Sequence, residues 1–274
     1  MARYFLHIAY NGENYCGWQR QQNAVSVQQV LEEALQTVFR FEVSVVGCGR
    51  TDTGVHASMY YAHFDDESGA VNDFVDDFVD DFVDGSFGGF PGGSVSSSVG
   101  RKFIYQLNSI LPKDIVVYGI YRVSSEIHAR FSAISRTYQY HVHNEKDPFV
   151  DRFSHYIPFV SDMEAINEAG QWLLAQSDFT SFAKLHTDNK TNLCVLTEAR
   201  IEKTENNRYV FTFTANRFLR NMVRAMVGTL LEVGNGKISQ EQFKDIVKAR
   251  NRSVAGTSVP AKALFLTDIK YEQD

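Results

Sequence analysis

The 274-residue sequence has little of several features that would assign it to a functional class directly. It has only three cysteines (Cys16, Cys48 and Cys194) and no C-x-x-C spacing, which favours reduced thiols in a cytoplasm over a disulfide framework or zinc site. No run of about 18 apolar residues occurs, so no membrane-spanning helix is expected. The first residues alternate like a strand and lack the apolar core of a signal peptide. Walker and G-x-G-x-x-G sequences are missing, so neither ATP nor NAD is expected as a cofactor.

Acidic residues outnumber basic ones, 33 to 27, but the excess comes from one segment. The net charge is −6, and residues 65–84 hold nine acidic residues without a lysine or arginine. Without those nine negative charges the rest of the chain carries +3. A mildly basic remainder permits an RNA-binding face without requiring one.

The first half of the chain predicts the element order β-α-β-β-α-β. Ser26 and Gln29 have the spacing of a capping box before a helical apolar stripe, and Pro112 stops a second helix. The predicted elements are strands over 4–10, 42–48, 59–64 and 114–122, and helices from 27 and over 102–111.

The second half predicts a similar order. Ser161 with Glu164, and Ser239 with Gln242, are the predicted caps of two helices. Strands are predicted over 137–143, 195–203, 209–215 and 263–271, and a long helix over 218–233. We therefore predict an α+β fold of two ferredoxin-like βαββαβ units, 1–123 and 124–274, around a mostly antiparallel sheet.

Residues 72–100 differ from their surroundings. Three Phe-Val-Asp repeats precede a Gly/Ser-rich tract, and the like charges four residues apart oppose a helix. The composition favours a poorly ordered acidic surface insertion, with an acidic interaction module as the alternative.

The loop over residues 49–57, with the sequence GRTDTGVHA, lies between two predicted strands. Glycines at its ends permit tight turns, and Asp52 is the carboxylate at its centre. An active-site carboxylate is one interpretation. The other is an ordinary turn in which Asp52 hydrogen-bonds its own backbone.

This loop resembles the catalytic-loop signature of the tRNA pseudouridine synthase A family. Other segments agree with the family's motifs in the same order: 10–21 (YNGENYCGWQRQ), 128–140 (HARFSA and RTYQY), 178–182 and 215–224 (ANRFLRNMVR). One position, Ile127, departs from the family's phenylalanine. Only the insertion lacks a counterpart in the resemblance.

The resemblance implies a homodimeric enzyme that converts uridine to pseudouridine in the anticodon stem-loop of tRNA, at tRNA positions 38, 39 and 40, without a cofactor. Asp52 is then the nucleophile, at ribose C1′ or base C6, and Arg224 its charge partner. By the same resemblance Tyr138 stacks on the target base, and Arg50 contacts the RNA and replaces the flipped nucleotide.

Three further arginines are candidate contacts to the RNA backbone. Arg217 and Arg220 are expected with Arg224 on one face of the long helix, near its N-terminus, and Arg20 lies in the N-terminal motif. Ordinary roles compete with all of these assignments. A helix arginine is often a solvated surface residue, and a strand tyrosine such as Tyr138 often only packs.

Two other functions remain open from the sequence. His141 and His143 face one side of a strand, but nothing completes a metal site, and His56 and His128 are interpreted as structural or RNA-proximal. The second is a non-catalytic RNA-binding protein built on RRM-like sheets. Such a module needs no nucleophilic carboxylate, so Asp52 with Arg224 distinguishes the enzyme from it.

Overall fold

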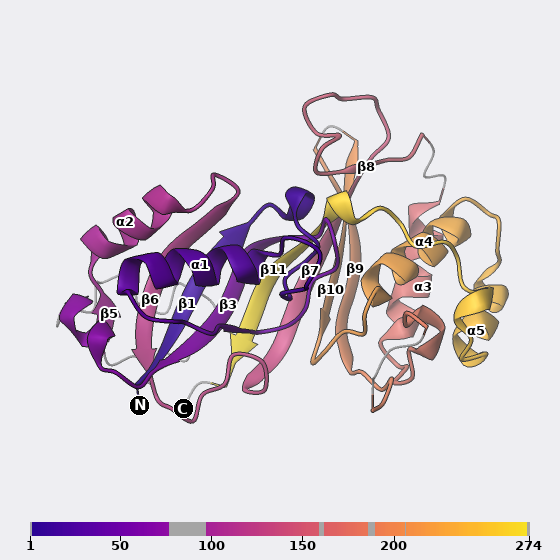
Figure 1. The fold of residues 1–274 in the computed structure, drawn as a ribbon. Coiled ribbons are helices and arrows are strands. Elements are labelled where there is room, and N and C mark those ends of the chain that lie inside the picture. The colour runs from indigo at the N-terminus through magenta and orange to yellow at the C-terminus, as the bar shows by residue number, and fades with distance from the viewer. Residues whose placement is uncertain (1, 77–96, 159–161, 186–189, 206, 273–274) are drawn as a thin grey trace. The chain divides into compact units, whose positions relative to one another are not determined.

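The computed structural model describes residues 2–76, 97–158, 162–185, 190–205 and 207–272 (Figure 1). The chain forms two compact units, Met1–Ile134 with Leu266–Asp274, and Ser135–Phe265. The predicted boundary between residues 123 and 124 falls earlier than this one. The C-terminal segment, expected in the second half, groups with the first unit.

The first unit has the predicted β-α-β-β-α-β order. Its strands β1 (Ala2–Tyr10), β2 (Val46–Gly47), β3 (His56–Asp66) and β6 (Ile115–Val123) lie in the order β6-β1-β3-β2 with antiparallel neighbours. This is the strand order of a split, ferredoxin-like unit. Helices α1 (Val27–Phe39) and α2 (Arg101–Ile110) cover one face of this sheet, and β11 (Leu264–Tyr271) lies beside β3 (Figure 1).

The burial of the central strand β1 shows that both faces of this sheet are covered. Residues 4–8 are buried without interruption, as expected for a strand packed on two sides. Toward the helices, Phe39 packs against Phe64 and Phe103. On the other face Phe5 contacts the rings of His63 and Tyr271. Ser26 caps α1 as predicted, because its hydroxyl accepts from the Gln29 N–H, and the Gln29 side chain donates to Glu33.

The strand predicted over 42–48 is wrong for most of its length. Only Val46–Gly47 pairs with β3. The Val45 N–H instead donates to the Glu32 carboxylate at 3.0 Å, and the Val45 carbonyl accepts from the Gln28 amide at 2.9 Å. Because these two backbone groups are already bonded to side chains of α1, they do not join the sheet ladder.

The ends of the acidic segment belong to the sheet. Strands β4 (Val75–Asp76) and β5 (Ser97–Val99) pair antiparallel, and β5 joins the β6 edge. The Phe74 ring packs at 4.4 Å from Phe103, and Val99 is buried. The prediction of a surface insertion over the whole of 72–100 is therefore wrong at its two ends, which pair with the sheet. Its central part, 77–96, lies outside the described residues.

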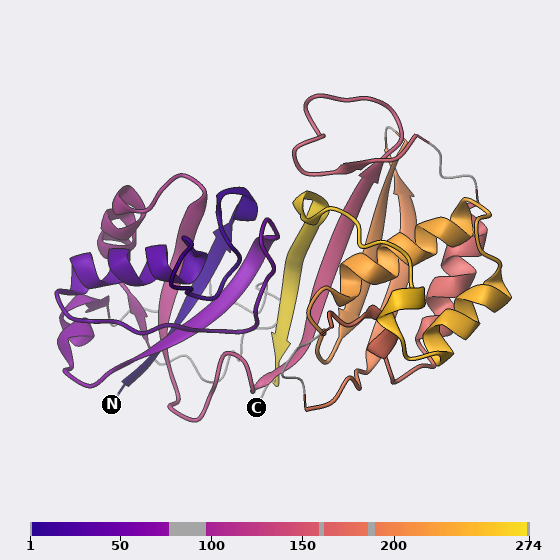
Figure 2. The same cartoon turned by 45° about the vertical axis from the view of Figure 1, so that its right-hand side comes forward.

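The second unit repeats part of the same arrangement. Strands β7 (Ala133–His143), β10 (Arg208–Ala215) and β9 (Leu196–Thr204) lie in that order as antiparallel neighbours, and β8 (His155–Tyr156) runs parallel to the end of β7. Helices α3 (Met163–Leu173), α4 (Met222–Gly234) and α5 (Gln240–Lys248) lie over one face (Figure 2). The α+β class with mostly antiparallel strands is confirmed. Short 3-10 helices occur at Gly12–Asn14, Ala70–Phe74, Thr180–Phe182, Arg252–Val254 and Ala261–Ala263.

Capping confirms one of the predicted helix starts here and corrects the other. Ser239 and Gln242 form the expected reciprocal capping box of α5. Helix α3 is capped by Asp162, whose carboxylate accepts from the Ala165 N–H at 2.9 Å, and the proposed cap Ser161 lies outside the described residues. No helix in the described part of the chain is long and apolar enough to cross a membrane.

The paired ends of the acidic segment allow its removal to be tested. Replacing residues 78–96 by Asn-Gly should leave the free energy of unfolding unchanged within about 0.5 kcal/mol, because β4 and β5 are already antiparallel and a two-residue turn suits them. Deleting 72–100 is the control and should cost about 3 kcal/mol or more, because Phe74 and Val99 are lost. Urea unfolding measures both. Equal losses would show that the central part also belongs to the core.

Candidate active site

The loop over 49–57 is packed against the N-terminal segment that contains Gly12, Gly17 and Trp18. The backbone N–H of Trp18 donates to the Thr51 carbonyl at 3.3 Å. The backbone N–H of Gly54 donates to the Tyr15 carbonyl, also at 3.3 Å. Two of the motifs on which the sequence resemblance depends are therefore in direct contact, although more than thirty residues separate them.

The same segment also closes the N-terminus of α1. The Val27 and Gln28 N–H groups donate to the carbonyls of Gly17 and Trp18 at 3.2 and 3.0 Å. The first N–H groups of a helix have no partner inside the helix, so these bonds satisfy two of them. Residues 17–18 thus lie between the start of α1 and Thr51.

Glycine is required at two positions of this contact. A Cβ on Gly17 would lie 2.2 Å from the Thr51 carbonyl oxygen, and the φ angle of Gly17 is +82°. A Cβ on Gly12 would lie 2.0 Å from the Val55 carbonyl oxygen. The backbones approach too closely for any other residue without rearrangement.

Three aromatic side chains pack together next to the loop, and two of them hydrogen-bond to it. Trp18 stacks on Tyr60 with 4.2 Å between ring centroids, and Tyr10 packs against both rings. The Tyr10 hydroxyl bonds to Thr51 Oγ1 at 2.9 Å, and the Tyr60 hydroxyl donates to the Gly49 carbonyl. These contacts fix the backbone on both sides of Asp52.

Asp52 stands at the start of a tight turn. Its carbonyl accepts from the Val55 N–H at 3.1 Å, and Gly54, with φ of +77°, is the third residue of the turn. The Asp52 side chain is half-buried. A carboxylate on a rigid turn with partial access to solvent can approach a bound substrate with little loss of conformational freedom.

Arg50 lies on the exposed side of the same loop. Its Nε donates to Gln19 Oε1 at 3.3 Å. The side-chain amide of Gln19, in the N-terminal segment, thus orients the Arg50 guanidinium without carrying a charge. Arg50 is two residues from Asp52 in the sequence.

Two histidines of the motifs have structural partners. His56 is buried, and its Nδ1 accepts from the Gly12 N–H at 3.1 Å. His128 Nδ1 accepts from the N–H groups of Arg130 and Phe131 and closes its own loop. Burial lowers the pKa of His128 below its usual value. Both side chains therefore act as hydrogen-bond acceptors that shape the backbone.

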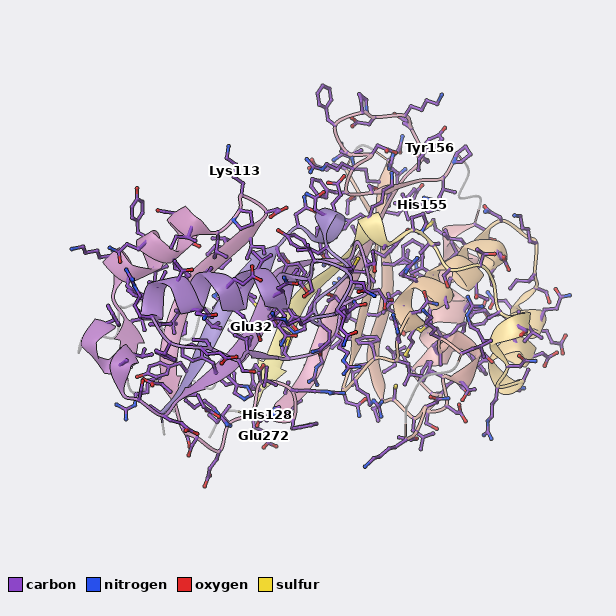
Figure 3. All side chains as sticks on the ribbon, in the orientation of Figure 1. Glu32, Lys113, His128, His155, Tyr156 and Glu272 are labelled. Carbon is purple, nitrogen blue, oxygen red and sulfur yellow. The ribbon has the colours of Figure 1, made fainter. Side chains whose placement is uncertain are left out.

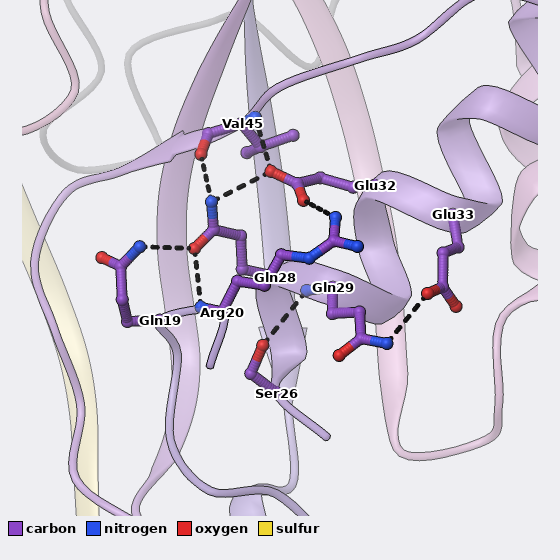
Figure 4. A network of polar contacts seen from close by, with 8 residues as sticks. All are labelled: Gln19, Arg20, Ser26, Gln28, Gln29, Glu32, Glu33 and Val45. Carbon is purple, nitrogen blue, oxygen red and sulfur yellow. Dashed lines mark hydrogen bonds and ion pairs between the residues drawn. The ribbon is translucent and has the colours of Figure 1, made fainter. Parts of the chain in front are cut away.

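Arg20 forms a salt bridge with Glu32. Its guanidinium bonds to the Glu32 carboxylate at 3.0 Å, with 55% of the side chain exposed. Glu32, on α1 (Figure 3), belongs with Gln28 to a buried polar network that includes Gln19 (Figure 4). Sequence reasoning missed both residues, although their spacing of four residues beside an apolar helix stripe was a usable signal.

In the second unit Arg224 is firmly attached to the backbone. It is half-buried on α4, and its Nε donates to the Val259 carbonyl at 2.7 Å. The Val259 N–H in turn donates to the Arg224 carbonyl at 3.2 Å. An arginine anchored in this way differs from the freely solvated surface arginine of the competing interpretation.

The two tyrosines of β7 have different environments. Tyr140 is completely buried, its hydroxyl donates to the Pro260 carbonyl, and burial raises its pKa. Tyr138 is half-buried, and its ring meets Phe218 edge-on at 5.1 Å. Tyr140 therefore serves packing, while Tyr138 keeps ring surface accessible.

The predicted stripe of arginines on the long helix is wrong. Helix α4 starts at Met222, so Arg217 and Arg220 lie in the segment before it. Asn221 causes the later start, because its φ of +66° is left-handed and cannot continue a right-handed helix. Its side chain bonds to the Ser258 hydroxyl at 2.7 Å. Arg220 remains exposed and Arg217 is half-buried.

The two histidines of β7, His141 and His143, have separate surroundings. His143 Nδ1 bonds to the Ser154 hydroxyl at 3.0 Å, and the His141 ring contacts Phe265 edge-on. Among the residues that the structure describes, no three histidine, cysteine or acidic side chains are grouped as a metal site.

The candidate residues thus fall into two sets. Asp52, Arg50 and Arg20 belong to the first unit, and Tyr138, Arg224, Arg217 and Arg220 belong to the second. Each unit holds its own set in place. The ion pair between Asp52 and Arg224 stays a prediction.

Comparison with known proteins adds to this geometry. Residues 170–272 match the family model described as tRNA pseudouridine synthase. The chain is 47% identical over 274 residues to tRNA pseudouridine synthase A of Parabacteroides distasonis, covering 100% of this chain and 98% of the relative.

Other bacteria have similar proteins. A tRNA pseudouridine synthase A of Porphyromonas gingivalis is 46% identical over 275 residues, covering 100% of this chain and 99% of the relative. One of Clostridium acetobutylicum is 35% identical over 272 residues, covering 97% and 98%. The similarity therefore extends over nearly the whole of each chain.

The close backbone contact at Gly17 can be tested by substitution. Gly17→Ala should lower the free energy of unfolding by about 2–4 kcal/mol, because the new Cβ meets the Thr51 carbonyl and the left-handed φ is strained. Gly49→Ala is the matched control from the same region, since no atom lies within 4 Å of its added Cβ. Urea unfolding of the two variants compares them, and equal stability would contradict the packing described.

Proposed function

Because the chain belongs to the tRNA pseudouridine synthase A family, we propose that it converts uridine to pseudouridine in the anticodon stem-loop of tRNA, at tRNA positions 38, 39 and 40, with Asp52 as nucleophile. The observation that carries the proposal is the contact between the Asp52 loop and the N-terminal motif through Gly12 and Gly17. Full-length relatives share the name of an enzyme. This favours the enzyme over an RNA-binding module without catalysis.

The reaction rearranges bonds within one nucleotide. The bond between uracil N1 and ribose C1′ breaks, the base turns, and C5 bonds to C1′. The C5 proton leaves and N1 gains a proton, so atoms and electrons balance without an oxidant or reductant. No cofactor is required for such an isomerisation.

An ionised carboxylate is the group that this chemistry needs from the protein. Asp52 attacks either ribose C1′ or base C6, and a covalent intermediate holds one fragment while the uracil turns. The fixed turn supports this role because it reduces the motion that must be lost before attack. A nearby cation would favour the charged carboxylate, and Arg224 is the proposed one.

The substrate base must leave the RNA stack to reach such a carboxylate. Tyr138 is the proposed stacking partner, since its ring is held edge-on by Phe218 and keeps accessible surface. Stacking of a base on an aromatic ring contributes about 1–3 kcal/mol. Arg50, exposed in the same loop as Asp52, is proposed to occupy the place that the base vacates.

The RNA backbone is the proposed partner of the remaining arginines. Arg220 is exposed in the irregular segment before α4, and Arg217 lies close to it in sequence. Arg20 retains an exposed guanidinium despite its bond to Glu32. Contacts of arginine to phosphates would give sequence-independent, salt-dependent affinity.

We place the enzyme in the cytoplasm as a homodimer. The three cysteines form no disulfide, and burial raises the pKa of Cys194 to about 11, which suits a structural thiol in a reducing compartment. The dimer rests on the family resemblance alone.

The role of Asp52 is tested by removing its charge. Asp52→Asn should abolish turnover, because a neutral amide is no carboxylate nucleophile, while tRNA affinity should change less than about threefold. Release of tritium from uracil C5 of unmodified tRNA measures turnover, with binding recorded on the same samples.

The control for this variant is Glu33→Gln, the same loss of charge at an exposed carboxylate of α1. It should release tritium at the parental rate. A folded Asp52→Asn protein that also keeps the parental rate would rule out the nucleophile. A parental protein that binds tRNA without releasing tritium would restore the binding-module alternative.

The role of Arg220 is tested by the salt dependence of binding. Arg220→Ala should weaken the binding of all tRNAs alike and reduce the slope of log affinity against log salt by about one unit. Arg200→Ala is the control, because Arg200 is an exposed arginine already paired with Glu198 and Glu202. If both variants leave the slope unchanged, Arg220 is only a solvated surface residue.

A further inference from the structure

Helix α1 buries two polar side chains on a face that is otherwise apolar. Gln28 and Glu32 have exposed fractions of only 8% and 7%, and they lie beside Leu31 and Leu35, which are fully buried. A buried carboxylate is costly unless it is paired and hydrogen-bonded. Their partners therefore indicate what these residues do.

Every hydrogen bond of Glu32 goes to a different part of the N-terminal region (Figure 4). One carboxylate oxygen accepts from the Val45 N–H at 3.0 Å and from the Gln28 amide at 2.9 Å. The other accepts from the Arg20 guanidinium at 3.0 Å. The charge of Glu32 is thus matched by the charge of Arg20.

Gln28 extends the network toward the loop. Its Oε1 accepts from Gln19 Nε2 and from the Arg20 N–H, both at 2.9 Å, and its Nε2 donates to Glu32 and to the Val45 carbonyl. Two donors face the oxygen and two acceptors face the nitrogen, so the amide has one favourable orientation. Gln28 therefore sets the direction of Gln19.

Gln19 passes this orientation to Arg50. Its amide nitrogen is bonded to Gln28, so its oxygen is turned to the Arg50 guanidinium, which donates at 3.3 Å. A chain of hydrogen bonds thus joins the buried Glu32 to Arg50, which is exposed in the loop that contains Asp52.

The two arginines are treated differently by this network. A carboxylate holds Arg20 and largely cancels its charge, whereas a neutral amide orients Arg50 and leaves its charge available. A cation that must meet RNA benefits from orientation without neutralisation.

We propose that Gln28 and Glu32 are positioning residues, which act through Gln19 to hold Arg50 in the orientation that binds the substrate RNA. The inference rests on the proposed function and deepens it, because it assigns Arg50 rather than Arg20 as the principal charge contact at this loop. The competing explanation is a purely structural clamp that ties α1 to residues 43–45.

A double-mutant cycle separates these explanations. Gln19→Leu removes the last link to Arg50 and leaves the bonds among Gln28, Glu32 and Val45 intact. It should weaken tRNA binding about fivefold, and it should have no further effect when Arg50 is already alanine, because residues that act through one another are not additive. Binding is measured in the Asp52→Asn background, so that no turnover contributes.

The salt dependence of binding shows which arginine supplies the charge contact to the RNA. Arg50→Ala should reduce the slope of log affinity against log salt by about one unit, because a charge is lost. Gln19→Leu should leave this slope nearly unchanged, because it disturbs orientation alone. Arg20→Ala should lower the slope less than Arg50→Ala does.

The helix contains its own control. Gln29 and Glu33 form the same amide-to-carboxylate bond, at 2.9 Å, one residue further along and facing solvent (Figure 4). Glu32→Gln should weaken tRNA binding about fivefold, while Glu33→Gln should not. The Gln19 cycle decides the proposal even if Glu32→Gln does not fold.

Several results would overturn the proposal. These are an unchanged affinity of Gln19→Leu, an equal loss with and without Arg50, or an equal effect of Glu32→Gln and Glu33→Gln. A parental protein that binds tRNA but releases no tritium would contradict the proposed function and still leave this coupling measurable. A protein that does not bind tRNA would overturn both.

Discussion

The close approach of two backbones is the contact on which the candidate site depends. Residues 17–18 are held on one side by N–H groups at the start of α1 and on the other by Thr51. Gly12 and Gly17 allow this because a Cβ at either position would meet a carbonyl oxygen at 2.2 Å or less. Without that approach the turn at Asp52 would lose its support, and Trp18 and Tyr60 would lose the geometry in which they stack.

A buried polar network takes the place of strand pairing at Val45 and also connects α1 to Arg50. Val45 bonds to side chains of Gln28 and Glu32 instead of a neighbouring strand. The sheet is shortened there, but the helix gains a connection that extends through Gln19 to Arg50. A buried ion pair is weak evidence for stability. The network reaches Arg50, which lies two residues before the proposed nucleophile Asp52 in the same loop.

Much of the fold was predictable because its determinants are local. The apolar periods, Pro112 and the caps at Ser26 and Ser239 placed most strands and helices close to their observed positions. Local signals failed where a distant partner decided the backbone. The arginine stripe was wrong because Asn221, bonded to Ser258, takes a left-handed conformation before α4. Neither partner is visible from the helical period.

By itself the sequence determined the α+β class, the family motifs and the choice of Asp52, Arg50, Tyr138 and Arg224 as candidates, since residue types and spacing carry that information. Only the tertiary structure decided which of them are held and how. It shows that Tyr140 is packing, that Arg20 is paired with Glu32, and that Gln28 and Glu32 belong to the same network as Arg50. The physical reason is that burial and hydrogen-bond partners depend on residues far apart in the chain, which no local pattern encodes.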